Sequence, residues 1–464
     1  MQRTEHARSV PYTPLPIEPA RRYCLRLREE MERTGFLDDD GKRRFPSSPL
    51  FEPYGGRMFG MLVCTDDQGN ERVLKAFSGQ YLGAWEIPGW VPPVPDVPAY
   101  EAIVGRNDAS IHELSERLKE LDASRAEGGL RREAAGDDRG LRERRRMLTQ
   151  ESQRDVFALY SFCCYDGASR TFSDMAGEDL SYHRPLWRFP SGTGDCCAPK
   201  LLHQAFSHRL HPVSMAEFYF GAPNRSGTKT GGSFYPPCEE RCHPLLRHML
   251  GLDILYCDDH VAVVNKPSGL LSVPGRGEEK QDSVETRFRT LFPTCIRQPA
   301  VHRLDMDTSG LLILARDADS HRNLNIQFMN GIVAKEYVAL LEGIVPVREG
   351  IVELPFRLDV GDRPRQIYDE RFGKKGTTLW ERLSVETLPS GRTVTRVRFI
   401  PHTGRTHQLR VHSAHEKGLG HPVVGDRLYG TPAEGDRLAL HASKVTFRHP
   451  ATGDIMTFDC PPEF

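Results

Sequence analysis

The chain has 464 residues, of which 38% are hydrophobic and 27% charged, and its formal net charge at pH 7 is −1. This length allows roughly three domains with buried cores. The neutral balance gives no global charge signature, so a bound polyanion would have to be held by local basic patches. No apolar run approaches the about 20 residues that a membrane-spanning helix needs, which excludes a transmembrane protein.

The N-terminus is polar over residues 1–8 and then rich in proline, so it lacks the apolar core of a secretory signal. Eleven cysteines, an odd number in a long chain, fit reduced thiols better than a disulfide framework. We therefore expect a cytoplasmic protein.

Residues 1–106 are predicted to form an α/β or mostly β unit. Residues 57–63 and 72–77 alternate in the way typical of strands, with turn-forming residues 65–70 between them. The Pro-rich stretch 90–98 closes this unit.

Residues 107–160 change period and predict an antiparallel helical hairpin, a short coiled coil. Leucine and isoleucine recur at three- and four-residue spacing from Ile111 to Leu121, and Gly128-Gly129 supplies a turn. The basic run 142–146 has two interpretations, a contact with RNA phosphates or a solvated helix face, and the second is the commoner case.

Residues 161–248 are rich in Cys, His and Pro, and we expect an irregular segment packed with residues 1–106. Cys196, His203, Cys238 and Cys242 are weak candidates for a structural zinc site. Only the last two have ligand-like spacing, so buried free cysteines are the competing interpretation.

Residues 249–464 are predicted to form one domain with a mixed, largely antiparallel sheet and a few helices, which makes the fold class α+β. A helix is expected over residues 318–330, capped near Asp317. Strands are expected at residues 253–257, 261–264, 311–315, 337–341, 394–400, 444–448 and 455–458. No GxGxxG follows a strand and no phosphate-binding lysine loop is present, so a nucleotide cofactor is not expected.

Three segments of this domain place charged side chains beside strand-like sequence. The first, residues 301–315, runs from a polar loop containing Asp305 directly into an apolar strand, with a turn-forming Thr-Ser-Gly between them. The others are residues 335–340 and residues 403–412, where a strand ends and a short helix begins.

Together these segments resemble the RluA family of RNA pseudouridine synthases. The resemblance covers about residues 252–464 and rests on five motifs in the family's order, at residues 264–270, 302–310, 335–337, 404–412 and 421–426. The catalytic part is most similar to a compact member that acts on both rRNA and tRNA. Many members also carry an S4 domain, and residues 1–245 match none.

The resemblance implies that the enzyme isomerises uridine to pseudouridine in RNA, after flipping the base out, without a cofactor. Asp305 matches the family's catalytic aspartate. An ionised carboxylate can attack an electron-poor sugar carbon and then leave. Attack on C1′, addition to the base and removal of a sugar proton remain open. Asp307 occupies a position that the family pattern leaves free.

The resemblance also suggests roles for five other residues. Arg405 matches the arginine that pairs with the catalytic carboxylate, and Tyr337 the tyrosine that lies against the target base. Arg303 is expected to stack on bases or contact phosphates near the flipped nucleotide, and Lys335 and Arg410 to contact RNA. Read singly, each could instead be a structural or solvated residue.

Two other classes remain as alternatives. A metal-dependent hydrolase would use the histidines and aspartates near Asp305, although no HExxH pattern is present. A noncatalytic RNA-binding protein could have kept the fold. We expect a monomer, with a contact through the helical hairpin as the alternative.

Overall fold

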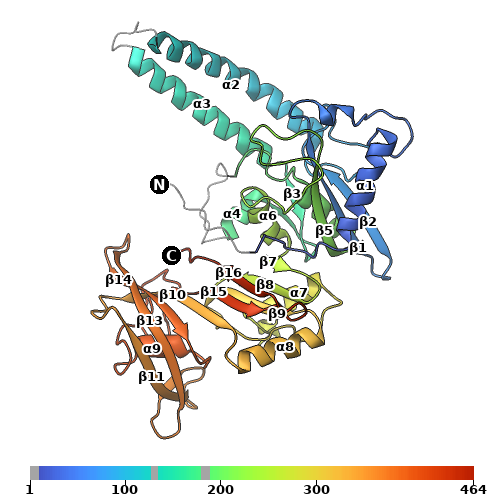
Figure 1. The fold of residues 1–464 in the computed structure, drawn as a ribbon. Coiled ribbons are helices and arrows are strands. Elements are labelled where there is room, and N and C mark those ends of the chain that lie inside the picture. The colour runs from blue at the N-terminus through green and yellow to red at the C-terminus, as the bar shows by residue number, and fades with distance from the viewer. Residues whose placement is uncertain (1–9, 127–133, 179–188) are drawn as a thin grey trace. The chain divides into compact units, whose positions relative to one another are not determined.

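The computed structural model describes residues 10–126, 134–178 and 189–464, which form two compact units. One unit comprises residues 17–251. The other joins the segment that ends at Pro16 to residues 252–464 (Figure 1). Within the described residues, no helix is long and apolar enough to span a membrane.

The N-terminal unit is built on a four-stranded antiparallel sheet with the order β2-β1-β5-β6. Its strands are β1 (Arg57–Thr65), β2 (Glu71–Phe77), β5 (His211–Phe220) and β6 (Phe234–Tyr235), and its two main covering helices are α1 (Ala20–Thr34) and α5 (Cys197–Ser207). Phe59 and Met61 join the core that contains α1, whereas Gly60 faces Cys197 of α5. Because alternate strand residues point to opposite faces, the two helices cover opposite faces of the sheet. This explains why seven consecutive residues of β1 are buried.

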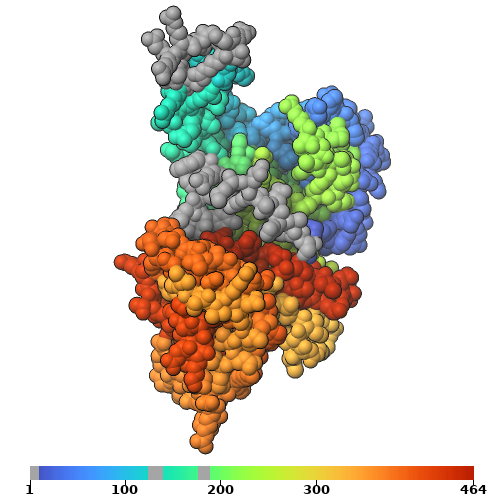
Figure 2. Space-filling model, turned by 60° about the vertical axis from the view of Figure 1, so that its left-hand side comes forward, coloured from blue at the N-terminus to red at the C-terminus, as the bar shows by residue number. Residues whose placement is uncertain are grey.

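The predicted helical hairpin is present as α2 (Val97–Ala126) and α3 (Ala134–Phe157). It extends away from the sheet of its own unit (Figure 1), and its surface projects from that unit in the space-filling view (Figure 2). Arg142 of α3 forms an ion pair with Asp122 of α2 at 2.5 Å. The expected turn at Gly128-Gly129 lies outside the described residues.

The expectation of an irregular segment at residues 161–248 is wrong for much of that range. It contains regular elements, namely β3 (Ser161–Cys163), β4 (Ser169–Thr171), α4 (Phe172–Glu178), α5, β5, β6 and α6 (Cys242–Met249). The last seven residues of β5 are all buried, because it lies in the sheet beside β1 and is covered on both faces. A strand that is buried on both faces lacks the alternation of apolar and polar residues that marks a half-exposed strand. Its sequence therefore gives little indication of a strand.

The C-terminal unit contains a ten-stranded sheet with the order β12-β11-β13-β14-β10-β15-β9-β8-β7, and β16 pairs with β15. All the pairs between described strands are antiparallel except β9 with β15. This confirms the predicted mixed, largely antiparallel α+β fold. The strands are β7 (Asp253–Cys257), β8 (Val261–Lys266), β9 (Ser309–Ala315), β10 (Ala334–Glu342), β11 (Glu349–Leu358), β12 (Gln366–Tyr368), β13 (Lys374–Thr387), β14 (Thr393–Pro401), β15 (Leu440–Arg448) and β16 (Ile455–Asp459), and the helices are α7 (Val284–Leu291), α8 (Ala318–Met329) and α9 (Gln408–Ala414).

Two hydrophobic cores stabilise this unit. One lies along β10, β11 and β14 and includes Leu409 of α9. The other lies along β8, β9 and β15 and includes Leu324 of α8. Helix α8 begins where predicted, since the Asp317 carboxylate accepts the amide hydrogen of Ser320 at 2.8 Å and satisfies a free donor of the first turn.

The segment before Pro16 belongs to the C-terminal unit, although the predicted boundaries assigned it to a domain of residues 1–106. Thr13 forms a parallel bridge with Tyr256, with hydrogen bonds to Leu255 (3.1 Å) and from Cys257 (2.7 Å). Val10 packs against the second core. These contacts cover the edge strand β7, which sequence order alone could not indicate.

We predict that a fragment of residues 252–464 folds, because both of its cores lie within it. It should be less stable, by about 1–3 kcal/mol, than the same fragment fused through a flexible linker to residues 10–16, because β7 loses two hydrogen bonds and the packing of Val10. Thermal unfolding followed by circular dichroism measures the difference. An insoluble fragment, or equal unfolding midpoints, would contradict this.

Candidate active site

Asp305 lies on a loop that enters β9, a strand whose seven residues are all buried. Gly310 has a φ of +111°, and a Cβ there would come within 2.4 Å of the Ala442 carbonyl oxygen on β15, so only glycine allows this close approach. The loop is thus fixed at the junction of β9 and β15. The Asp305 side chain is 20% exposed and can be reached from solvent.

The buried Lys266, at the end of β8, holds this loop. Its side chain is fully buried, and Nζ donates to the carbonyl oxygens of Pro267 (2.9 Å), Leu270 (2.8 Å) and Met306 (2.8 Å). Three acceptors match the three N–H groups of an ammonium ion, whereas a neutral amine has only two. Burial lowers the pKa of Lys266 to about 7, while the charges of Asp307 and Asp305 oppose the shift.

Two serines near Lys266 add further anchors. Ser268 Oγ donates to the Asp307 carbonyl oxygen at 2.7 Å. Ser272 Oγ donates to the Leu304 carbonyl oxygen at 2.8 Å and accepts the Leu304 amide hydrogen at 3.0 Å. The sequence alone assigned no individual role to Lys266 or to these two serines. A sequence signal for this anchor exists, namely a lysine that ends an apolar strand and is followed by Pro-Ser-Gly.

The Asp305 carboxylate faces two side chains from the segment around α9. Arg410 Nη1 lies 3.5 Å from Asp305 Oδ2, and His407 Nε2 lies 3.9 Å from the same oxygen. Arg410 also forms a bidentate pair with Asp426, at 2.8 and 2.7 Å. Both partners are buried, with side-chain exposures of 5% for Arg410 and 0% for Asp426.

Two assignments for arginine need correction. Arg405 was expected to pair with Asp305, but Arg405 is exposed, and the described ion pair is made by Arg410. Gln408 accepts hydrogen bonds from Thr403 Oγ1 and the Arg405 amide, which fixes the turn before α9 and leaves Arg405 outside it. Arg410 was expected to contact RNA, but its guanidinium is buried between two carboxylates and is not available to phosphates.

His407 is the second neighbour of Asp305. It has a φ of 54° and precedes α9, and Nδ1 lies 2.9 Å from the hydroxyl oxygen of Tyr429. That hydroxyl accepts the Gln366 amide hydrogen at 2.7 Å, so it can donate to His407 and favour the tautomer with a proton on Nε2. Burial lowers the pKa of His407, although the Asp305 charge opposes this. His407 therefore offers Asp305 a neutral N–H group at neutral pH.

Tyr337 lies on β10, between β14 and β15, and is half-buried. Burial raises its pKa, and the charge of Asp305 raises it further. On the same strand, Lys335 is half-buried, with Nζ 5.7 Å from the centre of the Phe328 ring, and burial lowers its pKa. Of the three predicted catalytic residues and Arg410, the structure shows an ion pair between Asp305 and Arg410.

Arg303 is exposed and makes no ion pair within the described residues. Its charge interacts with His407, one of the two groups that face Asp305. An unpaired guanidinium at the mouth of the site is free to contact a ligand.

Asp305 could instead be a structural carboxylate that satisfies the turn after it, or a metal ligand of a hydrolase, and the described residues have the features of neither. Its carboxylate accepts no hydrogen bond from the backbone of residues 308–310 within the described chain, so it is not an Asx-turn. The described residues also place no group of three metal-ligating side chains around it. The hydrolase interpretation therefore gains no support.

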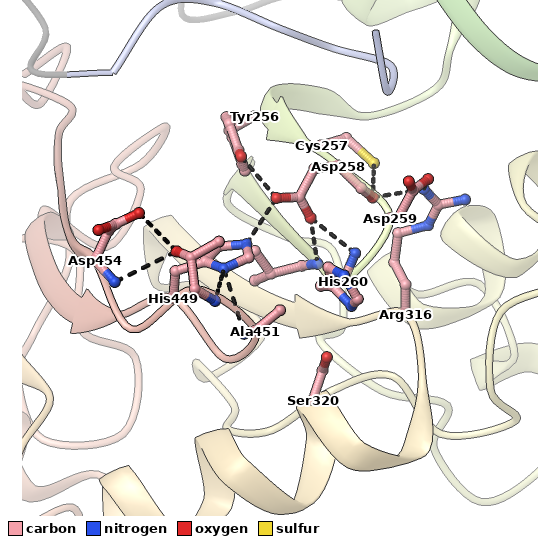
Figure 3. Close-up of polar contacts among 12 residues, drawn as sticks. Tyr256, Cys257, Asp258, Asp259, His260, Arg316, Ser320, His449, Ala451 and Asp454 are labelled. Atoms are coloured by element: carbon pink, nitrogen blue, oxygen red, sulfur yellow. Dashed lines mark hydrogen bonds and ion pairs between the residues drawn. The ribbon is translucent and has the colours of Figure 1, made fainter. Parts of the chain in front are cut away.

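A second polar cluster, which sequence reasoning missed, lies at the turn between β7 and β8 (Figure 3). Asp258 accepts hydrogen bonds from Tyr256 Oη (2.7 Å), His449 Nε2 (2.7 Å) and the amides of His260 and Val261 (both 2.8 Å). These four hydrogen bonds satisfy the acceptor oxygens of the Asp258 carboxylate, which lies in the turn. The cluster ties this turn to the residues after β15 and has a structural role.

In the N-terminal unit, the structure brings together three of the four suggested metal ligands. The sulfur atoms of Cys196, Cys238 and Cys242 all lie within 4.8 Å of one another. His203 does not join them, because its Nδ1 accepts the Cys163 amide hydrogen at 3.0 Å. The suggestion of His203 as a ligand is therefore wrong.

Comparisons with known proteins identify the class of enzyme to which the C-terminal unit belongs. A family model described as RNA pseudouridylate synthase matches residues 260–415. The dual-specificity RNA pseudouridine synthase RluA of Escherichia coli K12 is 45% identical over 216 residues, which cover 46% of this chain and 94% of that protein. The enzyme of the same name from Haemophilus influenzae is 44% identical over the same coverage.

Among solved structures, human RNA pseudouridylate synthase domain containing 1 matches with a TM-score of 0.39 and 28% identity, over 46% of this chain and 84% of that chain. On the sequence comparisons, the chain belongs to the RluA-type RNA pseudouridine synthases. It is therefore an isomerase that converts uridine in RNA to pseudouridine.

We predict that Lys266→Met lowers the free energy of unfolding of the C-terminal unit by about 3–5 kcal/mol, because three buried carbonyl groups lose their donor. Lys280→Met is a matched control, because Lys280 is 61% exposed and should change stability by less than about 0.5 kcal/mol. Urea denaturation of both variants measures the effect. Equal stabilities would show that Lys266 does not hold the loop.

Proposed function

We propose that Asp305 is the catalytic residue of this isomerase and that Arg410, not Arg405, holds its carboxylate. The observation that carries the proposal is the position of the carboxylate. It is accessible on a loop anchored by Lys266, and it lies 3.5 Å from an arginine that is itself fixed by Asp426. Such a carboxylate is paired with a cation, oriented and close to solvent, as attack on a sugar or base requires.

The reaction breaks the C1′–N1 bond of uridine, turns the uracil, and forms a C5–C1′ bond, after which C5 loses its proton and N1 takes up a proton. No electron is gained or lost overall, so the proposed chemistry uses protein side chains alone. Tyr337 is proposed to lie against the base and to take part in moving the C5 proton, as the family resemblance implies, and its half-buried place on β10 leaves part of the side chain accessible. The exact step taken by Asp305 stays open among the three alternatives.

We further propose that RNA is held by a few local basic residues, since the net charge is −1. Arg303, exposed and unpaired among the described residues, is the first of these, and Lys335 the second. As the base leaves its stack, the Arg303 guanidinium can stack on neighbouring bases or contact phosphate. Arg410 is not included among these RNA-contacting residues, because its guanidinium is buried between Asp305 and Asp426.

The substrates we propose are uridines in rRNA or a tRNA stem-loop, as the family resemblance implies. We also propose that the protein is a monomer and that it is located in the cytoplasm. The cytoplasmic location is supported by the eleven cysteines that form no disulfide, which fit a reducing compartment. A structural zinc ion in the N-terminal unit is also part of the proposal, separate from catalysis.

We predict that Asp305→Asn lowers the release of tritium from RNA containing C5-tritiated uridine by about 10³-fold or more, because the amide cannot replace a charged carboxylate. Transcripts of rRNA and of tRNA serve as substrates. Asp307→Asn is a matched control two residues away, and it should retain activity within about threefold.

Two results would contradict this assignment. Full tritium release by Asp305→Asn would remove Asp305 from the chemistry. An inactive wild-type chain that binds these RNAs would favour a noncatalytic RNA-binding protein. Unchanged release after treatment with a chelator would remove the metal-dependent hydrolase.

A further inference from the structure

The three clustered cysteines of the N-terminal unit come from two separate segments. Cys196 is the residue before α5, and Cys242 is the first residue of α6, with Cys238 four residues earlier in the preceding turn. Helices α5 and α6 pack against each other. The cluster therefore lies where the start of one helix meets the start of the other.

The spacing of the sulfur atoms fits a tetrahedral metal site. Zinc–sulfur bonds of about 2.3 Å at tetrahedral angles place sulfur atoms about 3.8 Å apart. Here the Sγ atoms of Cys238 and Cys242 are 3.4 Å apart, and no pair in the cluster exceeds 4.8 Å. The observed range brackets the expected distance.

The cysteines of the cluster contact one another. The Sγ atom of Cys238 lies within hydrogen-bonding distance of the Sγ atom of Cys242, at 3.4 Å. Other buried cysteines of this unit are different. Cys24 and Cys197 each lie alone and donate to backbone carbonyl oxygens, at 3.4 Å, as protonated thiols do.

Charged groups near the cluster fit a bound cation with three thiolates. Zn²⁺ and three thiolates together carry a charge of −1. Lys200, one turn along α5 from Cys196, is 1% exposed, and its Nζ has no hydrogen-bond partner among the described residues and lies 4.5 Å from the centre of the Phe77 ring. It can balance that negative charge.

A four-coordinate zinc ion needs one ligand besides the three sulfur atoms. Among the described residues, no fourth Cys, His, Asp or Glu side chain joins the three cysteines within the same 4.8 Å, so the protein supplies three ligands.

We propose that Cys196, Cys238 and Cys242 bind one Zn²⁺ ion. The ion ties the turn before α6 to the start of α5, where each helix lacks a side-chain cap. This site lies in a different unit from Asp305 and plays no part in the isomerisation. It is a structural site, and thiolate ligands select zinc over hard cations such as Mg²⁺.

The test uses the full chain purified without chelator, with zinc measured by mass spectrometry of the metal. We expect about one zinc ion per chain, lost in Cys238→Ser and retained in Cys163→Ser, a matched control in the same unit. Cobalt in place of zinc should give thiolate-to-metal charge-transfer absorption in wild type and Cys163→Ser, and not in Cys238→Ser.

Three outcomes would overturn the proposal. They are wild-type chain that binds neither zinc nor cobalt, a disulfide between Cys238 and Cys242 in place of metal, and equal loss of metal in Cys163→Ser. Cobalt absorption of wild type needs no substitution, so a variant that fails to fold leaves the test intact. Metal content and tritium release are measured on the same samples, and Asp305→Asn should keep its zinc whatever its activity.

Discussion

The buried pair between Arg410 and Asp426 is the contact on which the active site depends. Both side chains are almost fully removed from water, and their two hydrogen bonds fix the plane of the guanidinium. Loss of one partner from such a pair typically costs about 3–5 kcal/mol, because the other charge stays buried and unpaired. With two of its nitrogens used by Asp426, Arg410 presents the third to Asp305.

The Asp426 carboxylate also fixes the other residues on this side of the Asp305 loop. It accepts the amide hydrogens of Leu428 and Tyr429, and the Tyr429 hydroxyl in turn contacts His407, the other neighbour of Asp305. On the side of β8, Lys266 fixes the loop that carries Asp305. A short, solvent-accessible loop is thereby held from two distant parts of the sequence, which is how a reactive group is kept in place without being buried.

Much of this unit could be predicted from the sequence. The loop of Asp305, the strand after it and the helix capped by Asp317 follow from local patterns, because a polar turn next to a solid apolar run has few alternatives. The predicted strands at residues 253–257 and 455–458 lie in β7 and β16. The family resemblance supplied the rest of the candidate site.

The errors concern information that local sequence does not contain. Arg405 and Arg410 stand in one short motif, and only the turn fixed by Gln408 and the start of α9 decide which of them points inward. His203 was grouped with the cysteines by composition, whereas the fold directs it to a backbone amide. The segment around Thr13 pairs with residues more than 240 positions away, at Leu255 and Cys257, and no pattern near Thr13 indicates this partner.

The most direct test of the account compares Arg410→Gln with Arg405→Gln in single-turnover isomerisation and in RNA binding. The account predicts that Arg410→Gln slows the chemical step by about 10²-fold or more while Kd for RNA changes little, because a group that orients the carboxylate is lost. Arg405→Gln should keep the rate of the chemical step. A slowed step in Arg405→Gln with a normal rate in a folded Arg410→Gln protein would contradict the account.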